Sequence, residues 1–372
     1  MSNGNDLYYI HLFNDFSGSP RVLSDAINCE VNSRGNTYVF TSRHNGFLDK
    51  VKAKKVSCFY ARSSNRYVQF IIFSISQLLL FFQLVWYLIV GFTQGRKSTV
   101  VINTMLPFGA GLAAKLMRAK AVYYIHETYI SPITFKKFLR FFIEHCSDNV
   151  IFVSKYLASV ESFKRPIQTV LYNGLRSDFP QNISVDKRLK FNNKEILFVG
   201  SLRLYKGVNE LFSLSQLLPD FNFILALNCD RRELDCFLKG RVIPENMSIV
   251  VRPKKLSSYY SSSFIVLNLT LVDTVVETFG LSLMEGMAFG SPVIGPPVGG
   301  PTEFIDVKSG LLIDSLKIEE IATFINYLDS SFSIWCSYSD SAFKVSKKFT
   351  FTEYKNNFRK YVDEKELLFK EN

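Results

Sequence analysis

Two glutamates, eight positions apart, are the residues of this sequence best spaced for chemistry on a polar ligand. Glu277 precedes and Glu285 follows the turn TFGL at residues 278–281. This turn can begin a helix whose first N–H groups, near Gly280, lack intrahelical partners and attract an anion. Both carboxylates can then accept hydrogen bonds from hydroxyls of the same ligand. The spacing therefore predicts a site for a ligand that carries phosphate together with ribose or sugar hydroxyls.

A glycine-flanked loop with two cations follows an apolar segment earlier in the chain. Residues 195–199 (EILFV) predict a strand, and the loop GSLRLYKG follows at residues 200–207. Arg203 can bind two phosphate oxygens with its planar fork, while Lys206 supplies a point charge. Paired cations of this kind can stabilise a departing diphosphate in place of a divalent metal.

A histidine stands at the end of a predicted strand in the first half of the chain. Residues 121–125 (AVYYI) predict a buried strand that ends at His126 and Glu127. In open α/β sheets the carboxyl ends of strands face the ligand, so His126 is placed for chemistry. His11 is a weaker candidate, and we expect His44 and His145 to be structural.

The first strand is predicted at residues 7–13, and it leads into a turn of small residues. Its residues Ser17, Gly18 and Ser19 precede an apolar helical pattern. Backbone N–H groups in such a turn can approach a phosphate or a sugar hydroxyl closely. Gly18 is therefore a candidate donor-binding residue.

The residues from Glu277 onward resemble a known family. They follow E-x7-E with F-G-L inside it, and then G-x-P-V-I-x-x-x-x-G-G-x-x-E. This pattern resembles the nucleotide-sugar site of glycosyltransferase family 4 (glycosyl transferases group 1), retaining enzymes of the GT-B fold. The pair Lys206–Gly207 and the pair His126–Glu127 also match. The chain departs from the family at Ser201, where an arginine is usual, and in its first loop, which is usually richer in glycine.

The resemblance implies an α/β fold of two Rossmann-like, doubly wound parallel-sheet domains that face a cleft. We expect an acceptor-side, membrane-facing domain over residues 1–185 and a nucleotide-sugar-binding domain over residues 190–345. Residues 346–372 are expected to form a helix that packs back on the first domain. The predicted helical pattern itself runs from Phe349 to Leu368.

The resemblance also implies retaining transfer of a hexose-type sugar from a nucleotide diphosphate sugar to a hydroxyl, with no metal and no cofactor. Glu277 would contact the hydroxyls of the transferred sugar and Glu285 the ribose. His126 would position or polarise the sugar. The predicted catalytic residues are thus His126 and Glu277, and the predicted donor-binding residues are Gly18, Arg203, Lys206, Phe279, Gly280, Leu281 and Glu285.

Charge and composition point to the acceptor and to the compartment. The net charge is +11, and residues 1–180 hold 21 Lys and Arg against 10 Asp and Glu. Such a surplus attracts nucleic acid, an anionic membrane or an anionic substrate, and no nucleic-acid motif accompanies it. The six cysteines lack C-x-x-C spacing, which favours a reduced, cytosolic protein. The first residues, MSNGNDLYYIHLFND, do not predict a signal peptide.

Residues 67–95 form an apolar segment with no charged residue between Arg66 and Arg96. Its length permits a membrane-spanning helix. The polar residues Gln69, Ser76 and Gln83 recur every seven positions, which favours a buried or membrane-surface helix instead. With the basic surplus, this segment predicts peripheral attachment to the inner face of the cytoplasmic membrane.

The expected acceptor is therefore a lipid-linked, pyrophosphate-bearing glycan. Synthesis of a bacterial surface polysaccharide, such as the O-antigen of lipopolysaccharide or capsule, fits this expectation. Two other functions remain open: a nucleotide-sugar epimerase of the GT-B fold, and a non-catalytic, membrane-associated scaffold. The cations, both glutamates and His126 favour transfer.

Overall fold

The chain forms two compact units, each built on a parallel β-sheet. The computed structural model describes residues 4–29, 35–180 and 182–362. The first unit comprises Met1–Tyr172 with Thr352–Asn372, and the second comprises Asn173–Phe351. Both are α/β units whose strands alternate with helices, so the predicted fold class of two parallel-sheet α/β domains is confirmed. The chain passes from the first unit to the second at residues 172–173, ahead of the boundary expected at 185–190.

The first unit contains a seven-stranded sheet with the order β3-β2-β1-β4-β5-β6-β7, in which every pair is parallel. Buried apolar runs form the central strands, as the sequence predicts for a sheet covered on both faces. Edge strand β3 has no such run, because only Val56 is buried in it. The strands are β1 (Asn5–Ile10), β2 (Thr37–Thr41), β3 (Lys54–Ser57), β4 (Lys97–Asn103), β5 (Lys120–Ile125), β6 (Asn149–Phe152) and β7 (Ile167–Val170).

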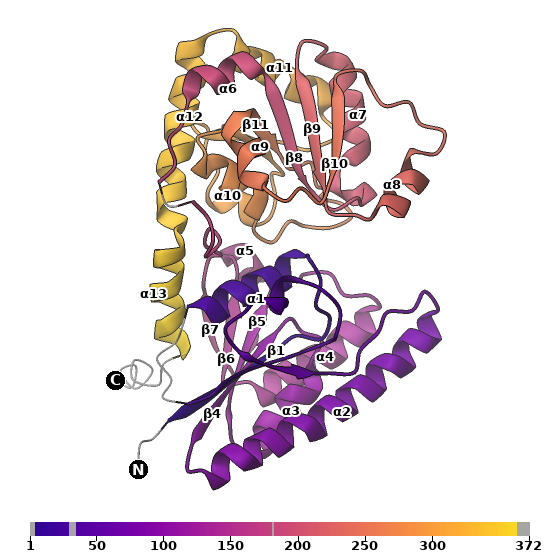
Figure 1. Cartoon of the computed structure of the whole chain (residues 1–372), viewed down its shortest axis with the longest axis vertical. Coiled ribbons are helices and arrows are strands. Elements are labelled where there is room, and N and C mark those ends of the chain that lie inside the picture. The colour runs from indigo at the N-terminus through magenta and orange to yellow at the C-terminus, as the bar shows by residue number, and fades with distance from the viewer. Residues whose placement is uncertain (1–3, 30–34, 181, 363–372) are drawn as a thin grey trace. The chain divides into compact units, whose positions relative to one another are not determined.

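Helices cover this sheet, and α2, α3 and α4 lie together on one side of it (Figure 1). The helical elements are α1 (Gly18–Asn28), η1 (Phe47–Asp49), α2 (Arg66–Thr93), α3 (Phe108–Leu116), α4 (Ile133–Cys146), α5 (Lys155–Val160) and α13 (Phe351–Val362). α2 is long and apolar enough to cross a membrane by length and composition. It is also the connection from edge strand β3 to central strand β4.

The polar stripe of α2 faces the protein. Gln69 accepts a hydrogen bond from the Ser63 N–H at 2.7 Å, and Gln83 donates to the Ser57 carbonyl at 3.2 Å. Ser76 is buried. The stripe therefore fastens the helix to its own unit, and the opposite, apolar side of α2 is the exposed one.

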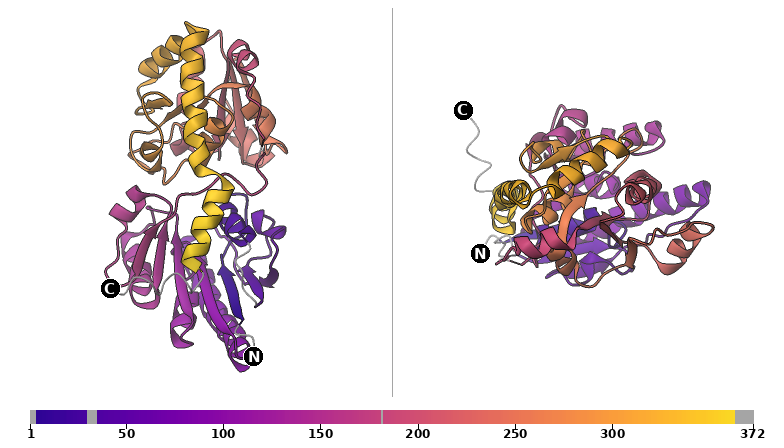
Figure 2. Two further views of the ribbon diagram at one scale, coloured as in Figure 1. Left: turned by 90° about the vertical axis from the view of Figure 1, so that its left-hand side faces the viewer. Right: turned by 90° about the horizontal axis from the view of Figure 1, so that it is seen from above.

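The last described helix, α13, belongs to the first unit. The rings of Tyr124 and Phe358 lie 6.5 Å apart, and the Arg359 side chain donates to the Cys29 carbonyl at 3.0 Å. Figure 2 shows this helix, in yellow, running along the ribbons of the first unit. The expected helical pattern extends to Leu368, and its residues 363–368 lie outside the described residues.

The second unit contains a six-stranded sheet with the order β10-β9-β8-β11-β12-β13, again parallel throughout. Trp335 is fully buried in its core, stacks on Phe264 and donates to the Phe264 carbonyl at 3.0 Å. The strands are β8 (Glu195–Gly200), β9 (Asn222–Leu227), β10 (Met247–Val251), β11 (Ser263–Leu267), β12 (Val293–Gly295) and β13 (Gly310–Leu312). The helical elements are α6 (Lys187–Asn193), η2 (Leu204–Lys206), α7 (Val208–Leu217), α8 (Arg231–Leu238), α9 (Leu256–Ser262), α10 (Leu281–Ala288), η3 (Gly300–Glu303), α11 (Ile318–Asp329), α12 (Phe332–Ser346) and η4 (Lys347–Phe349).

Candidate functional site

Both sheets reverse their strand order beside their first strand. In the first unit β1 lies between β2 and β4, and in the second unit β8 lies between β9 and β11. Loops at the carboxyl ends of the strands diverge at such a switch point, which is where open α/β sheets bind ligands. His126 follows β5 in the first unit, and Lys206 and Glu277 follow β8 and β11 in the second. The predicted residues thus fall into two clusters, one in each unit.

The cluster of the first unit is built around Asn103, the last residue of β4. Its Oδ1 lies 2.7 Å from Nε2 of His126, and its Nδ2 lies 3.0 Å from Nδ1 of His11. The same Nδ2 donates to the Ser19 carbonyl at 3.1 Å. Since β1, β4 and β5 are neighbours in the sheet, their carboxyl ends bring these three residues together.

The contact with Ser19 fixes the orientation of the Asn103 amide. A backbone carbonyl only accepts hydrogen bonds, so the NH₂ group of Asn103 must face it. The amide oxygen then faces His126, whose Nε2 must carry a proton to donate to it. The neutral His126 ring is therefore the Nε2–H tautomer, which leaves Nδ1 as a hydrogen-bond acceptor.

Burial keeps both histidines neutral. It lowers the pKa of His126 to about 3, with His11 adding to the effect, and it lowers the pKa of His11 to about 4. Burial also raises the pKa of Glu127, whose carboxylate accepts from the Met105 N–H at 2.8 Å. The folded chain binds fewer protons on these histidines than the unfolded chain below about pH 6.5, so their burial costs stability as the pH falls through that range.

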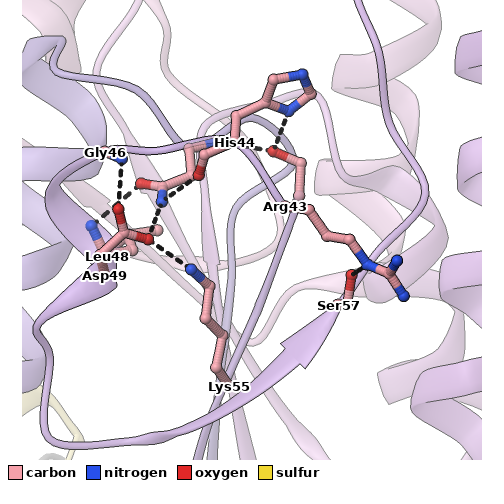
Figure 3. A network of polar contacts seen from close by, with 9 residues as sticks. Arg43, His44, Gly46, Leu48, Asp49, Lys55 and Ser57 are labelled. Carbon is pink, nitrogen blue, oxygen red and sulfur yellow. Dashed lines mark hydrogen bonds and ion pairs between the residues drawn. The ribbon is translucent and has the colours of Figure 1, made fainter.

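A network of hydrogen bonds holds the loop that follows β1. Asn14 donates to the His44 carbonyl at 2.8 Å and to Asp49 at 2.9 Å, and it accepts from the Leu48 N–H at 3.1 Å. Figure 3 shows Asp49 bound in turn by Lys55 and by the Gly46 N–H. Although burial opposes it, the contact with Lys55 leaves the pKa of Asp49 lowered. This network fixes the start of the Ser17–Ser19 turn.

Gly18 lies in that turn, at the first position of α1. A Cβ built on Gly18 would meet no atom within 4 Å, so the space beside its backbone is open. This openness is compatible with the predicted donor contact, which stays a prediction.

The cluster of the second unit is built around an ion pair between Lys206 and Glu277. Their Nζ and Oε2 atoms lie 2.7 Å apart, and Asn268 donates to the same Oε2 at 2.9 Å. Thr270 completes the cluster through its hydroxyl, which donates to Asn268 at 2.6 Å. Burial alone would raise the pKa of Glu277, but the charge of Lys206 and the hydrogen bonds hold that pKa below its ordinary value. Glu277 is thus an ionised carboxylate beside a cation.

Glycines allow the backbone around this cluster to pack closely. Gly207 has φ 81°, and a Cβ there would lie 2.2 Å from the Leu269 carbonyl oxygen. Gly299 has φ 98°, and a Cβ there would lie 2.2 Å from the carbonyl oxygen of Glu277. These two positions require glycine, and they bring the Lys206 loop and the Gly299 loop against the β11 loop.

The turn before α10 has the predicted form. Gly280 has φ 96° and is the N-cap of α10, so Leu281 is the first helical residue. The Phe279 side chain is buried and packs on Phe304 and Phe349, at ring distances of 5.5 and 6.0 Å. Phe279 therefore anchors the turn in the core, and only its backbone is available to a donor.

Glu285 is engaged within its own unit. It is buried, and its carboxylate accepts from the Tyr260 hydroxyl at 2.8 Å and lies 3.5 Å from Nε of Arg176. A Glu285 carboxylate held in this way is oriented by two partners. Its contact with a ribose stays a prediction.

Arg203 lies apart from this cluster. Its side chain is exposed and forms an ion pair of 3.4 Å with Glu233 of α8, whereas Lys206 is mostly covered. The structure therefore separates the two predicted diphosphate ligands, and Lys206 is the one that contacts Glu277. In residues 4–29, 35–180 and 182–362 no group of three or more His, Cys, Asp or Glu is suited to hold a metal ion.

Three polar residues at the strand ends were not among the predicted site residues: Asn103, Asn268 and Thr270. Each stands at, or within three residues of, the carboxyl end of a buried strand, which is the signal that could have found it. Their partners are far away in the sequence, so only the strand order shows which charged or ionisable residue each one supports.

Comparison with known proteins identifies the class to which this architecture belongs. Residues 181–331, all within the second unit, match the family described as glycosyl transferases group 1. HepE from Anabaena, solved in complex with UDP-glucose, superposes with a TM-score of 0.77 at 16% identity, covering 96% of this chain and 99% of that one. The architecture is that of the GT-B fold.

Two curated relatives agree with this class. An uncharacterized glycosyltransferase of Haemophilus influenzae is 28% identical over 44% of this chain and 47% of its own length. Another, from Methanocaldococcus jannaschii, is 28% identical over 60% of this chain and 63% of its own. The match thus spans about half to two thirds of these relatives. Residues 181–331 are thus similar to the glycosyl transferases group 1 family, as the resemblance predicted.

The contacts of Asn103 with His11 and His126, which we call the Asn103 clamp, make a testable prediction about the pKa of His126. Replacing Asn103 by Asp places a carboxylate beside both rings, which stabilises the imidazolium form. We expect the pKa of His126 to rise from about 3 toward or above its ordinary 6.5. NMR titration of the ring signals measures it, with the four histidines assigned through single His→Gln variants.

The matched control is Asn65→Asp, which adds the same charge to the same unit at the N-cap of α2. A carboxylate caps a helix as well as Asn does, so this variant should fold normally. Identical titration of His126 in the Asn65 and Asn103 variants would contradict the clamp.

The Lys206–Glu277 pair makes a prediction about stability. Lys206→Met leaves the Glu277 carboxylate covered and without its cation, and we expect the free energy of unfolding to fall by about 2–4 kcal/mol at pH 7. The pair stabilises the fold above the ordinary pKa of Glu277, so the difference from the native chain should shrink as the pH falls below about 4.5. Denaturant unfolding followed across pH measures both effects.

Lys187→Met serves as the comparison, because Lys187 contacts Asp340 at 2.6 Å on the surface and should contribute only about 0–1 kcal/mol. The double variant Lys206→Met with Glu277→Gln should regain at least about half of the loss. Equal losses from the two lysine variants would rule out a special role for the Lys206 pair.

Proposed function

We propose that this chain is a retaining glycosyltransferase. It moves a hexose-type sugar from a nucleotide diphosphate sugar to a hydroxyl of a lipid-linked glycan, without a metal ion. The observation that carries the proposal is the Lys206–Glu277 ion pair at the strand-order reversal of the second unit, within the segment that matches the family. The UDP-glucose present in the HepE structure supports a nucleotide-sugar donor.

The second unit would bind the donor. Lys206 faces the diphosphate and stabilises the negative charge that develops as the sugar leaves, with the first N–H groups of α10, at Gly280 and Leu281, as further donors. Glu277 accepts hydrogen bonds from sugar hydroxyls while Lys206 and Asn268 keep it ionised. Arg203 would join the diphosphate only after leaving Glu233, and Glu285 would accept from the ribose.

The first unit would orient the transferred sugar. The neutral His126 ring is fixed by Asn103 as the Nε2–H tautomer, so its Nδ1 accepts a hydrogen bond from a sugar hydroxyl. The bond between the anomeric carbon and the phosphate oxygen breaks as the acceptor oxygen bonds to the same face of that carbon. The leaving phosphate oxygen takes the acceptor's proton, so no separate protein base is required.

The acceptor and the location are inferred from charge and surface. The basic surplus of residues 1–180 and the apolar helix α2 favour an anionic, lipid-linked glycan at the inner face of the cytoplasmic membrane. All six cysteines are free, which agrees with a reducing compartment. Synthesis of a bacterial surface polysaccharide, O-antigen or capsule, is the process that fits best.

The test is a transfer assay. Purified protein and a bacterial lipid extract are incubated with a panel of UDP-, GDP- and dTDP-sugars, and both lipid-bound sugar and free nucleoside diphosphate are measured. One donor should give both products in equal amounts. Glu277→Gln and Lys206→Ala should each lower the rate by at least about 100-fold, because each removes a group that acts on the transition state.

Lys187→Ala, which breaks a surface pair, should retain the full rate. The anomeric configuration of the product, read by NMR, tests retention. Conversion of the free nucleotide sugar to an isomer would indicate an epimerase. Absence of turnover with every donor would favour a scaffold.

A further inference from the structure

The outer side of α2 is an exposed apolar surface. Seven large side chains follow one another at steps of three or four residues, so they form one straight line along the helix. Trp86, Phe82 and Leu78 are 66%, 61% and 58% exposed. We call this line the outward stripe; it comprises Tyr67, Ile71, Ile75, Leu78, Phe82, Trp86 and Ile89, all of them exposed. Single exposed apolar residues are ordinary, but a continuous line of this length marks an interaction surface.

The opposite side of α2 is tied into the first unit. Gln77 accepts from the Gly109 N–H of α3 at 3.0 Å, and a Cβ on Gly109 would lie 2.5 Å from the Gln77 carbonyl oxygen. Leu80, Leu84 and Leu88 are buried on this side. In a transmembrane orientation α2 would lose these contacts with the rest of the first unit. The helix therefore offers the outward stripe to its partner while it remains part of the fold.

Buried aromatic contacts join α2 to its neighbouring helices. The Phe73 ring of α2 lies on the buried side and contacts Phe108 of α3 and Phe135 of α4, at centroid distances of 6.0 and 5.2 Å. Figure 1 shows these helices side by side on the same face of the sheet. On α4, Phe138 and Phe141 are exposed. Exposed aromatic side chains are thus present on more than one helix of this side.

The chain segment that contains α2 and α3 carries charges of a single sign, and three of its cations, Lys55, Arg62 and Arg96, pair with Asp49, Asp15 and Asp6 outside that segment. Every charged residue among residues 50–126, the segment that contains α2 and α3, is basic: Lys50, Lys52, Lys54, Lys55, Arg62, Arg66, Arg96, Lys97, Lys115, Arg118 and Lys120. Arg66 and Lys97 flank the two ends of α2. Lys115 lies in the last turn of α3 and Arg118 lies two residues beyond it, and all four side chains are exposed. An apolar surface edged by cations is complementary to the acyl chains and anionic headgroups of a bilayer.

We propose that the first unit docks on an anionic membrane through the outward stripe, with α2 lying in the plane of the interface rather than across the bilayer. The inference deepens the proposed function and rests on it for its purpose, because docking would bring a lipid-linked acceptor to the carboxyl ends of β1, β4 and β5. The docking itself depends only on the surface of the first unit.

The chain carries its own probe for this docking. It has two tryptophans, of which Trp86 lies in the outward stripe and Trp335 is fully buried in the second unit. Trp86 should therefore dominate any change in emission. With vesicles of phosphatidylcholine and 30% phosphatidylglycerol we expect a blue shift and quenching by brominated acyl chains. Trp86→Phe should abolish both signals.

Vesicle cosedimentation of the full chain measures the affinity. The triple variant Leu78→Ser, Phe82→Ser, Trp86→Ser should bind anionic vesicles at least about 30-fold more weakly, since three large apolar side chains leave the interface. The native chain should bind pure phosphatidylcholine vesicles at least about tenfold more weakly than anionic ones. The matched control is Val242→Ser with Val307→Ser, at two positions of the second unit that are 89% and 82% exposed, and it should bind as the native chain does.

Three results would overturn the proposal. Equal binding by the triple and control variants would show that the outward stripe is not the contact. A dimer in lipid-free buffer that already shields Trp86 would assign the stripe to a second copy of the chain. Binding that is equal on neutral vesicles and irreversible on dilution would indicate a span.

These outcomes are separate from those of the transfer assay. A chain that transfers sugar to a water-soluble acceptor without binding vesicles would remove the docking and leave the proposed chemistry. A chain that binds vesicles but turns over no donor would do the reverse.

Discussion

In both sheets the first strand along the chain lies inside the sheet and not at its edge, and the rest of the molecule depends on this constraint. β1 and β8 each have the following strand on one side and a later strand on the other, and all strands in each sheet are parallel. Every strand of a sheet therefore delivers its carboxyl end to the same edge. This is how Asn103 comes within 3.0 Å of His11, and Lys206 within 2.7 Å of Glu277, across long separations in the sequence.

The polar clusters of the two units are stabilised in opposite ways. In the first unit an uncharged amide lies between two neutral histidines, and burial keeps both rings unprotonated. In the second unit a cation and a hydrogen-bonding amide keep the Glu277 carboxylate ionised. Buried polar groups are tolerated in either form, provided that each has a partner. The first unit thus carries an uncharged polar cluster and the second unit carries an ion pair.

Much of this architecture could be predicted because the central strands are written as buried apolar runs. Strands β5 and β8 match the predicted segments 121–125 and 195–199 to within one residue at each end. The turn after Glu277 was predictable because its backbone requires a positive φ at Gly280 and Gly299. Glycine adopts this conformation readily, so a short sequence motif is enough to mark such positions.

Other features depend on tertiary contacts that no local pattern carries. β3 was not predicted as a strand because an edge strand needs few apolar residues. Asn103 was not predicted as a site residue because its partners lie on other strands. The polar stripe of α2 was found, but the side it faces is decided by Ser57, Ser63 and the packing of the sheet. Periodicity alone could not show that the apolar side is the exposed one.

The position of α2 in the chain path has a consequence for protein engineering. This helix is the crossover from edge strand β3 to β4, the neighbour of β1, so it cannot be deleted without breaking the sheet. Truncation therefore cannot remove the exposed apolar side of α2 while the sheet stays intact. A chain without this exposed apolar side has to be made by replacing residues of the outward stripe with polar ones, while the buried residues Gln77, Leu80 and Leu84 are kept.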